Sequence, residues 1–557
     1  MPVKFDAKID GFFPMDDYFD LGAHTRPNAS QNPDAQMWFD RGLNWVFGFN
    51  HEEAIYCFEQ ALVADPKCVL ARWGIGYAVG PDYNLHWDLM PYPVKKNAVA
   101  TLAAQLDALD PLMATATPLE TTLVAALRCR VVALDEEEFA AQNDAYAAAM
   151  RRVCADHPGD LDVIALTAEA LMMRTPWQLW DLQTGNPTEG SDTLEAAALL
   201  ERAFEDVPGA WEHPGCLHLY IHLMEMSPHP ERALRHGDAL TGLVPDAGHM
   251  QHMGTHVDVL CGEYANVVRR NLRAWEADQK YLALRGPGTF YSTYICHDLH
   301  FAVYGAMFLG QLAPALKAAE ALEGILTPEV VEPSADWMES YWPMRFHAYV
   351  RFGEWAAIDA ADLPEDQELF CYSTAVILYA KGISAAVQGD VAEARNWQAR
   401  FAKATEAVPE ERVLFNNKCS DILAIADRML DGEILYREGK FEAAFDALRA
   451  AVAADDALPY EEPWGWMQPA RHALGALLLE QGHADEAEAV YRADLGLDPQ
   501  LSRACQNPDN IWSLRGLHTC LTRRGADAEA ALIKPALDKA VARADRAVAV
   551  SCFCAKG

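Results

Sequence analysis

Ten of the 18 histidines in this chain of 557 residues fall between residues 213 and 300, far more than a uniform distribution would place there. His218 and His222 are one helical turn apart, and others are three or four residues apart. Imidazole is a common ligand of zinc, copper, iron and nickel, and histidines at i and i+4 can bind one ion from a single helix. We therefore predict a transition-metal site formed by His218, His222, His249, His252, His256, His297 and His300.

Each of these histidine pairs is a weak signal by itself, because a histidine on an apolar helix face is usually a core residue. Seven imidazoles without charge or metal would need many hydrogen-bond partners in one place. The alternatives to a metal site are a histidine-lined substrate groove and coincidence. Three histidines and an open position form a typical catalytic site, so seven could bind one or two ions. We expect the remaining histidines of this region to lie at the surface: His213, His229 and His236.

A carboxylate and two thiols extend the candidate site. Glu225 follows His222 by three residues and could bind the ion, orient a histidine or act as a general base. Near the C-terminus, Cys552 and Cys554 form a Cys-x-Cys pair whose side chains point to one side of an extended segment. The pair predicts a tail that supplies thiolates to a soft metal over the groove. The alternative is two exposed thiols on a frayed terminus.

Composition limits the partners of the protein. Asp and Glu number 81 against 45 Lys and Arg, a formal net charge of −36, which repels phosphate backbones. We therefore expect no nucleic-acid partner and no anionic membrane, and no apolar run reaches the roughly 18 residues of a membrane span. The 13 cysteines show no disulfide framework, and the first residues lack the features of a secretory signal. These features predict a cytoplasmic protein with reduced thiols.

The elements that must position the histidines follow from a 34-residue period. The chain is rich in alanine and poor in β-branched runs, which favours helices. In a unit that starts at residue 35, position 4 is Trp38, position 8 is Gly42, position 20 is Ala54, position 24 is Phe58 and position 32 is Pro66. This pattern resembles the tetratricopeptide repeat (TPR), in which small residues let two helices approach and large ones fill the space between them.

The same spacing recurs along the chain. Clear units begin at residues 214, 248, 375, 425 and 468, and weaker ones begin near Val69, Leu161, Cys296, Glu339 and Asp509. We therefore predict an all-α fold, a TPR-like right-handed α-solenoid of roughly ten to eleven helix-turn-helix repeats.

The resemblance to TPR solenoids places the candidate residues on one face. In such solenoids the first helix of each repeat lines the concave groove, mainly through positions 2, 5, 9 and 12. All seven candidate histidines fall at these positions in the units that begin at Pro214, Gly248 and Cys296. Glu225 falls at position 12 and Tyr304 at position 9, so both are candidate catalytic residues. Adjacent helices pack at about 8–10 Å, so we expect these side chains to converge.

Two segments interrupt the period and define the expected organisation. A Trp- and Pro-rich insert near residues 174–193 is either a lid or a tolerated insertion, and a second break lies between residues 274 and 296. We predict five parts: an N-terminal extension (1–34), N-terminal repeats (35–213), central metal-binding repeats (214–338), C-terminal repeats (339–546) and a Cys-x-Cys tail (547–557).

Several motifs look like those of one uncharacterised subgroup of long cytosolic bacterial TPR proteins. They are FNHEEA (49–54), WGIGYAVGPDYN (73–84) and the histidine segments 218–234, 247–257 and 294–301. The resemblance implies the fold but no particular reaction, because TPR proteins are mostly protein-binding scaffolds. In the first motif Asn50 is expected to cap a helix. Trp73 and Tyr77 are expected to line one end of the groove.

These observations favour a metal-dependent enzyme, in the first place an oxidoreductase with a polyhistidine copper or iron centre that uses O₂ or a peroxide. One alternative is a zinc hydrolase with Glu225 as the general base. Another is a TPR scaffold or metal-trafficking protein that binds a partner peptide. The enzyme hypotheses predict a small-molecule or peptide substrate in the concave groove, and a protein partner is compatible with each of them.

Overall fold

The computed structural model describes residues 18–130, 136–499 and 501–555. Within these ranges the regular secondary structure is helical, apart from one short hairpin, in which β1 (Val413–Leu414) pairs with β2 (Asn417–Lys418), and an isolated bridge between Trp180 and Pro187. The predicted all-α, TPR-like solenoid class is confirmed. No helix among the described residues is long and apolar enough to cross a bilayer. The first half of the predicted N-terminal extension, residues 1–17, lies outside the described residues, as do residues 556–557 of the tail.

The chain divides into two compact units. The N-terminal unit comprises residues 2–257 and 273–295, and the C-terminal unit comprises residues 258–272 and 296–557. The predicted central segment, 214–338, is therefore divided between the two units. Three helices begin in one unit and end in the other: α12 (Thr255–Leu260), α13 (Tyr264–Arg285) and α14 (Ser292–Leu309).

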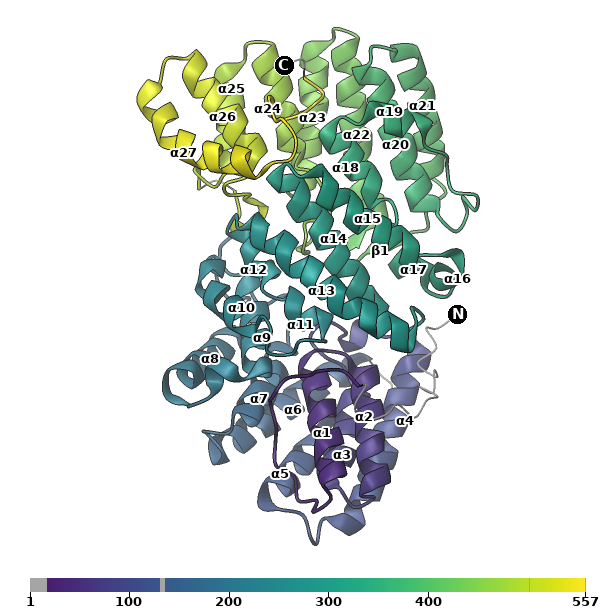
Figure 1. The fold of residues 1–557 in the computed structure, drawn as a ribbon, viewed down its shortest axis with the longest axis vertical. Helices are drawn as coiled ribbons and strands as arrows, with labels where there is room; N and C mark the ends of the chain where they lie inside the picture. Colours follow the sequence, from purple (N-terminus) through teal and green to yellow (C-terminus); the bar gives the residue numbers. More distant parts are fainter. Residues whose placement is uncertain (1–17, 131–135, 500, 556–557) are drawn as a thin grey trace. The chain divides into compact units, whose positions relative to one another are not determined.

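The N-terminal unit contains consecutive helix pairs (Figure 1). Its helices are α1 (Pro33–Phe47), α2 (His51–Ala64), α3 (Val69–Ala78), α4 (Tyr92–Leu109), α5 (Pro118–Leu127), α6 (Glu136–Asp156), α7 (Leu161–Met172), α8 (Thr193–Asp206), α9 (Pro214–Glu225), α10 (Leu234–Leu240) and α11 (Gly248–His252). Asn50 accepts a hydrogen bond from the Glu53 N–H at the start of α2, as predicted. Thr117 and Glu120 form a capping box at α5.

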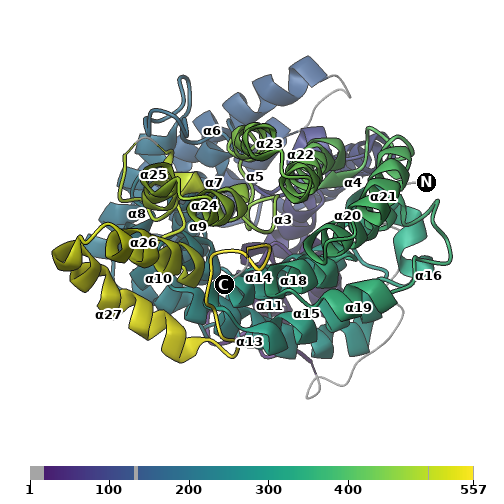
Figure 2. The same ribbon diagram turned by 90° about the horizontal axis from the view of Figure 1, so that it is seen from above.

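The C-terminal unit continues the same pattern. Its helices are α15 (Leu312–Ile325), α16 (Pro328–Val331), α17 (Ala335–Met338), α18 (Met344–Phe352), α19 (Trp355–Ala360), α20 (Cys371–Val387), α21 (Val391–Thr405), α22 (Cys419–Arg437), α23 (Phe441–Asp455), α24 (Ala470–Glu480), α25 (Ala484–Asp494), α26 (Ile511–Arg523) and α27 (Asp527–Arg543). Helices α20–α27 lie side by side in chain order (Figures 1 and 2). The turns inside the α20–α21 and α22–α23 pairs contain Gly389 and Gly439, whose φ angles are 89° and 75°.

The small and large residues of the repeat meet as the period predicts. A Cβ atom on Gly42 in α1 would lie 2.5 Å from the ring of Phe58 in α2. The corresponding pair in a later repeat is Gly475 in α24 and Tyr491 in α25, where the distance would be 2.6 Å. Glycine at position 8 therefore allows each helix pair to close on the aromatic side chain at position 24.

One first helix departs from the prediction. The unit that starts at Gly248 was expected to begin with one continuous helix, but Met253 and Gly254 separate α11 from α12. A Cβ atom on Gly237 in α10 would lie 2.8 Å from the Gly254 Cα, so the backbones of α10 and this break are in close contact. The close approach of two glycines explains where the helix is interrupted.

Candidate metal centre

Two candidate ligands come from one face of α9. His213 caps this helix by accepting the Cys216 N–H on its Nδ1 at 3.1 Å, and Pro214 begins the first turn. One turn separates His218 from His222, and both side chains are fully buried. Glu225 is the last residue of the helix and is 1% exposed. Local sequence therefore places two imidazoles and a carboxylate on one buried helix face.

Three further histidines come from the interrupted helix. His249 and His252 belong to α11, and His256 belongs to α12. All three are at most 1% exposed. The ring centroids of His218 and His249 are 5.0 Å apart, and those of His222 and His256 are 5.4 Å apart. Five of the seven predicted histidines thus lie together in the N-terminal unit.

The His218 imidazole is oriented by a backbone carbonyl. Its Nδ1 lies 2.6 Å from the Phe47 carbonyl oxygen, and a carbonyl only accepts, so Nδ1 carries the proton. The lone pair is then on Nε2, which has no hydrogen-bond partner among the described residues. Burial lowers the pKa of His218 to about 3, so the ring is neutral at physiological pH. A neutral imidazole with a carbonyl behind Nδ1 is the usual arrangement of a metal ligand.

Glu225 orients two imidazoles at once. Its two oxygens lie 3.1 Å from His222 Nδ1, and Oε2 lies 2.7 Å from His256 Nδ1. A carboxylate accepts hydrogen bonds, so both Nδ1 atoms donate and both rings turn Nε2 away from Glu225. Of the three roles predicted for Glu225, this geometry fits that of orienting ligands.

A hydrogen-bonded chain extends from Glu225 through two histidines. The Nε2 atoms of His252 and His256 are 2.8 Å apart, and the Thr255 hydroxyl lies 3.2 Å from His252 Nδ1. In the tautomer in which His256 donates from Nδ1 to Glu225, its Nε2 accepts from His252 Nε2. His252 then accepts on Nδ1 from the Thr255 hydroxyl. In these tautomers all the hydrogen bonds of the chain point toward Glu225.

His249 has the fewest hydrogen bonds of the five clustered imidazoles. Neither of its ring nitrogens has a hydrogen-bond partner among the described residues, although the ring is 1% exposed. Burial, followed by the neighbouring imidazoles, lowers the pKa of His249 well below its usual value. An uncharged buried imidazole with no partner costs about 1–3 kcal/mol of desolvation per polar group. A bound ion would remove this cost.

The donor atoms fit a transition-metal ion. One ligand atom each from His218, His222 and His249 lies within 4.8 Å of the other two. Metal–nitrogen bonds of about 2.0–2.1 Å in a tetrahedral site place donor atoms about 3.4 Å apart, which is inside this limit. The set is rich in neutral nitrogen donors, which zinc, copper, iron and nickel accept.

Three aromatic side chains enclose the imidazoles. The ring centroid of Phe49 lies 4.5 Å from that of His218, 5.7 Å from that of His222 and 6.0 Å from that of His249. The rings of Tyr83 and Trp177 stack with their centroids 5.4 Å apart. The centroid of the His222 ring lies 5.1 Å from that of Tyr83 and 6.1 Å from that of Trp177. Phe49 and Trp177 both have left-handed backbones, with φ angles of 56° and 57°. Such strain costs about 1–3 kcal/mol per residue and concentrates at functional sites.

This aromatic wall is the part of the site that the sequence interpretation missed. Phe49 belongs to the FNHEEA motif, whose residues were interpreted only as a helix start, and Tyr83 belongs to the WGIGYAVGPDYN motif. Trp177 comes from the insert at 174–193, which therefore contributes to the site. The lid interpretation of the insert was the sequence signal that pointed toward Trp177.

A second group of side chains that could bind a metal, His24, Asp162 and His213, is explained by hydrogen bonds and an ion pair within the protein. Asp162 accepts hydrogen bonds from His24 at 2.9 Å, from His213 at 3.1 Å and from Arg26. His213 uses its other nitrogen at the α9 cap. The carboxylate is thus neutralised by Arg26, and this group needs no ion. The structure also corrects the expectation that His213 and His236 are surface residues, because they are 2% and 7% exposed.

The remaining predicted ligands lie in the C-terminal unit on α14. The Nε2 of His300 is 2.7 Å from the sulfur of Met467, and its ring packs edge-on against Tyr341. His297 packs against Phe301 and Phe415. The ligand role of both histidines stays a prediction.

Tyr304 also lies in the C-terminal unit. It stacks on Phe308 at 4.4 Å and is 3% exposed. Burial raises the pKa of Tyr304 well above its usual value. Its catalytic role stays a prediction.

The cysteine pair does not present thiolates in the structure. Cys552 and Cys554, also in the C-terminal unit, form a disulfide with each other. Arg437 donates a hydrogen bond to the Cys554 carbonyl, and Phe553 contacts Gly353. A disulfide sulfur carries no negative charge, so the predicted metal binding by this tail requires reduction first.

Comparisons with known proteins provide no family for this chain. No protein-family model and no curated protein matches it. The sequence is 14% identical to the APC/C hetero-tetramer Cut9–Hcn1 (89% of this chain, 78% of that chain, TM-score 0.30) and 12% identical to yeast Tom70 (91% and 92%, TM-score 0.24). It is 11% identical to Naa15/Naa10 bound to HypK-THB (91% and 70%, TM-score 0.22). At these low TM-scores the similarities carry no inference about function, and the fold class follows from the helix pairs themselves.

Proposed function

We propose that this protein is a metal-dependent oxidoreductase whose ion is bound by His218, His222 and His249, with His256 and Glu225 beside them. The observation that carries the proposal is the environment of His249, a buried imidazole for which the described part of the chain supplies no hydrogen-bond partner on either nitrogen. The orientation of His218 by the Phe47 carbonyl supports it. Copper and iron suit this nitrogen-rich donor set and, when bound, supply one-electron chemistry with O₂ or a peroxide.

The residues around the donors support redox chemistry over hydrolysis. A zinc hydrolase needs a carboxylate that can take a proton from a substrate water. Glu225 instead bonds two imidazoles through its oxygens. Phe49, Tyr83 and Trp177 exclude water from the imidazoles, which strengthens electrostatic interactions inside the site. The chain from Thr255 through His252 and His256 holds protons in a fixed order beside the donor atoms.

A scaffold or metal-trafficking protein is the second candidate, favoured by the TPR-like helix pairs. In this case the ion is cargo, and the protein delivers it to a protein partner without turnover. Both candidates place the protein in the cytoplasm, where the eleven free cysteines would stay reduced.

The test is elemental analysis of full-length, tag-free protein, purified as expressed and again after anaerobic loading with Cu(I), Fe(II) or Zn(II). We expect one or two copper or iron ions per chain. His249→Ala should lower metal content about tenfold or more, because a first ligand is lost. His229→Ala is the matched control, because this imidazole is 64% exposed. Full metal content in His249→Ala, or no bound transition metal under any loading condition, would overturn the proposal. Peroxide- or O₂-dependent turnover separates the enzyme from the carrier.

A further inference from the structure

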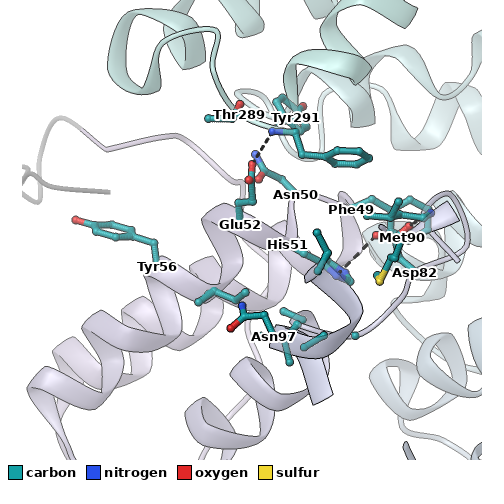
Figure 3. Close-up of a pocket in the computed structure, with 18 of the residues that line it drawn as sticks. Phe49, Asn50, His51, Glu52, Tyr56, Asp82, Met90, Asn97, Thr289 and Tyr291 are labelled. Atoms are coloured by element: carbon teal, nitrogen blue, oxygen red, sulfur yellow. Dashed lines mark hydrogen bonds and ion pairs between the residues drawn. The ribbon is translucent and has the colours of Figure 1, made fainter. Parts of the chain in front are cut away.

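A cavity of about 410 Å³ lies in the N-terminal unit next to the candidate metal centre. It is bounded by α2, by residues 78–85 after α3, by α4 and by residues 289–291 (Figure 3). Phe49 lines this cavity and also packs on His222 and His249. One aromatic ring therefore separates the cavity from the imidazoles. A volume of this size accommodates a small organic molecule.

Acidic groups outnumber basic ones among the side chains that line the cavity. They are the carboxyl groups of Glu52, Glu59 and Asp82, and the basic side chain in the lining is the imidazole of His51. Behind the wall, the Arg130 guanidinium donates to the Tyr77 and Pro81 carbonyls. The lining therefore offers more acidic than basic groups to a ligand.

Backbone donors hold two of these carboxyl groups in place, those of the buried Asp82 and the partly buried Glu52. The Phe290 N–H donates to Glu52 Oε2 at 3.0 Å, and the Asn84 and Leu85 N–H groups donate to Asp82 Oδ1 at 2.9 and 2.7 Å. The second Asp82 oxygen lies 3.7 Å from His51 Nδ1 (Figure 3). Burial raises the pKa of both carboxyl groups to about 7, so each is costly to ionise until a cation approaches it.

His51 supplies a further polar group. Its Nε2 has no hydrogen-bond partner among the described residues. Burial lowers the pKa of His51 to about 4, so the ring is neutral and can accept a hydrogen bond from a donor in the cavity. Apolar and aromatic residues, among them Phe49, Leu85, Met90, Val94, Phe290 and Tyr291, share the rest of the lining with the polar residues Asn50, Gln60, Asn97 and Thr289. The cavity thus combines anionic acceptors with an apolar body, which matches an organic ammonium ion carrying an aryl or alkyl group.

We propose that this cavity binds a small organic amine in its ammonium form, with Asp82 and Glu52 as its charge partners and Phe49 between it and the metal centre. That the amine is a substrate rests on the proposed function. The binding of the amine does not rest on the proposed function, because the cavity is complete without an ion.

The test is calorimetric titration of the full chain with three probes of similar size and different charge: 2-phenylethylammonium, 2-phenylethanol and 3-phenylpropanoate. We expect the ammonium ion to bind at least about tenfold more tightly than the alcohol, and the carboxylate to bind most weakly, because buried charge pairs discriminate strongly. Equal affinity for the ammonium ion and the alcohol would overturn the proposal. This comparison uses the unmodified protein and needs no variant.

Two substitutions identify the charge partners. Asp82→Asn and Glu52→Gln should each lower the affinity for 2-phenylethylammonium about tenfold and leave that for 2-phenylethanol within about twofold. Asp88→Asn is the matched control, because this carboxylate is 77% exposed and does not line the cavity. Unchanged ammonium affinity in both variants would remove these residues from the site and overturn the proposal. Alcohol binding shows that a variant cavity is still folded.

Metal analysis of the same samples separates the two hypotheses. Selective ammonium binding by protein that takes up no metal would support the amine site and contradict the metal centre. Metal-loaded protein without selectivity for the ammonium ion would support the metal centre and contradict the amine site.

Discussion

At the scale of single residues, the orientation of each imidazole has an identifiable cause. The Phe47 carbonyl determines the tautomer of His218, and Glu225 determines those of His222 and His256. The carbonyl contact leaves Nε2 of His218, and both ring nitrogens of His249, without a hydrogen-bond partner among the described residues. Such carboxylate and carbonyl contacts usually accompany histidines that bind metals.

Replacing Glu225 tests this orientation. Glu225→Gln keeps the shape, but it removes the negative charge and turns one of the two acceptor oxygens into an NH₂ donor. We expect metal affinity to fall about 10–100-fold with little change in helix content. Competition with a chromophoric chelator measures the affinity, and Glu231→Gln, an exposed acid of the same unit, is the control. Unchanged affinity would contradict the orienting role.

A second residue-scale prediction concerns pH. Burial raises the pKa of Glu52 to about 7 from the 4.5 of the unfolded chain. The folded state therefore keeps a proton that the unfolded state loses, and the stability present below pH 4.5 falls as the pH rises to about 7. The loss is on the order of 2–3 kcal/mol. Glu52→Gln removes this fall in stability with rising pH. The thermal midpoint of the variant should therefore increase relative to that of the native protein between pH 5 and pH 8.

The control for the pH prediction is an exposed acid on the same unit. Glu205→Gln should follow the native protein at every pH, because its carboxyl group is exposed in both states. A constant difference between Glu52→Gln and the native protein over this pH range would show that Glu52 ionises normally in the fold.

At the scale of elements, the interrupted helix α11–α12 brings three imidazoles to α9. Its first residue, Gly248, packs against α13, and a Cβ atom there would lie 2.0 Å from Asp278 Oδ1. The absence of a side chain at this position therefore determines how closely α11, with His249 as its second residue, approaches α13.

We expect Gly248→Ala to displace α11 or the Asp278 side chain. Overpacking of this kind typically costs about 1–3 kcal/mol, and a shift of α11 would also move His249 from its neighbours. Thermal unfolding and metal content measure the two effects. Gly288→Ala is the control, because a Cβ atom there has no neighbour within 4 Å and the backbone is not left-handed. Native metal content in Gly248→Ala would show that Asp278 yields instead of the helix.

At the scale of the whole molecule, stability in a repeat array comes from contacts between neighbouring helix pairs. A ligand at α9–α12 should therefore stabilise the repeats around it and leave distant ones unchanged. The helices α20–α27 form pairs of their own, with their own buried residues.

Removing the metal with a chelator should lower the protection of α9 and α11 against hydrogen exchange, by an amount that depends on free metal concentration and affinity. Exchange in α20–α27 should stay the same within error. Mass spectrometry of peptides from both regions measures the difference. Equal loss of protection along the chain would show that the ion stabilises the fold as a whole and not one site.

The repeat period was sufficient to predict the helix pairs, because it depends on local spacing. Gly42 and Phe58, or Gly475 and Tyr491, are 16 residues apart and meet wherever two helices with a short turn pack together. The i, i+4 spacing of His218 and His222 likewise places both on one helix face. The glycines in the turns and the shared helix face of His218 and His222 follow from such short-range rules.

Only the tertiary structure decided which distant groups complete the site. The carbonyl that orients His218 belongs to Phe47, 171 residues away, Phe49 follows in the same segment, and Tyr83 and Trp177 come from two further segments. The boundary between the two units also crosses the histidine segment, so His297 and His300 are assigned to the C-terminal unit and the other five to the N-terminal unit. Spacing along a helix specifies which face a side chain occupies, but a contact between distant segments depends on the packing of every helix between them.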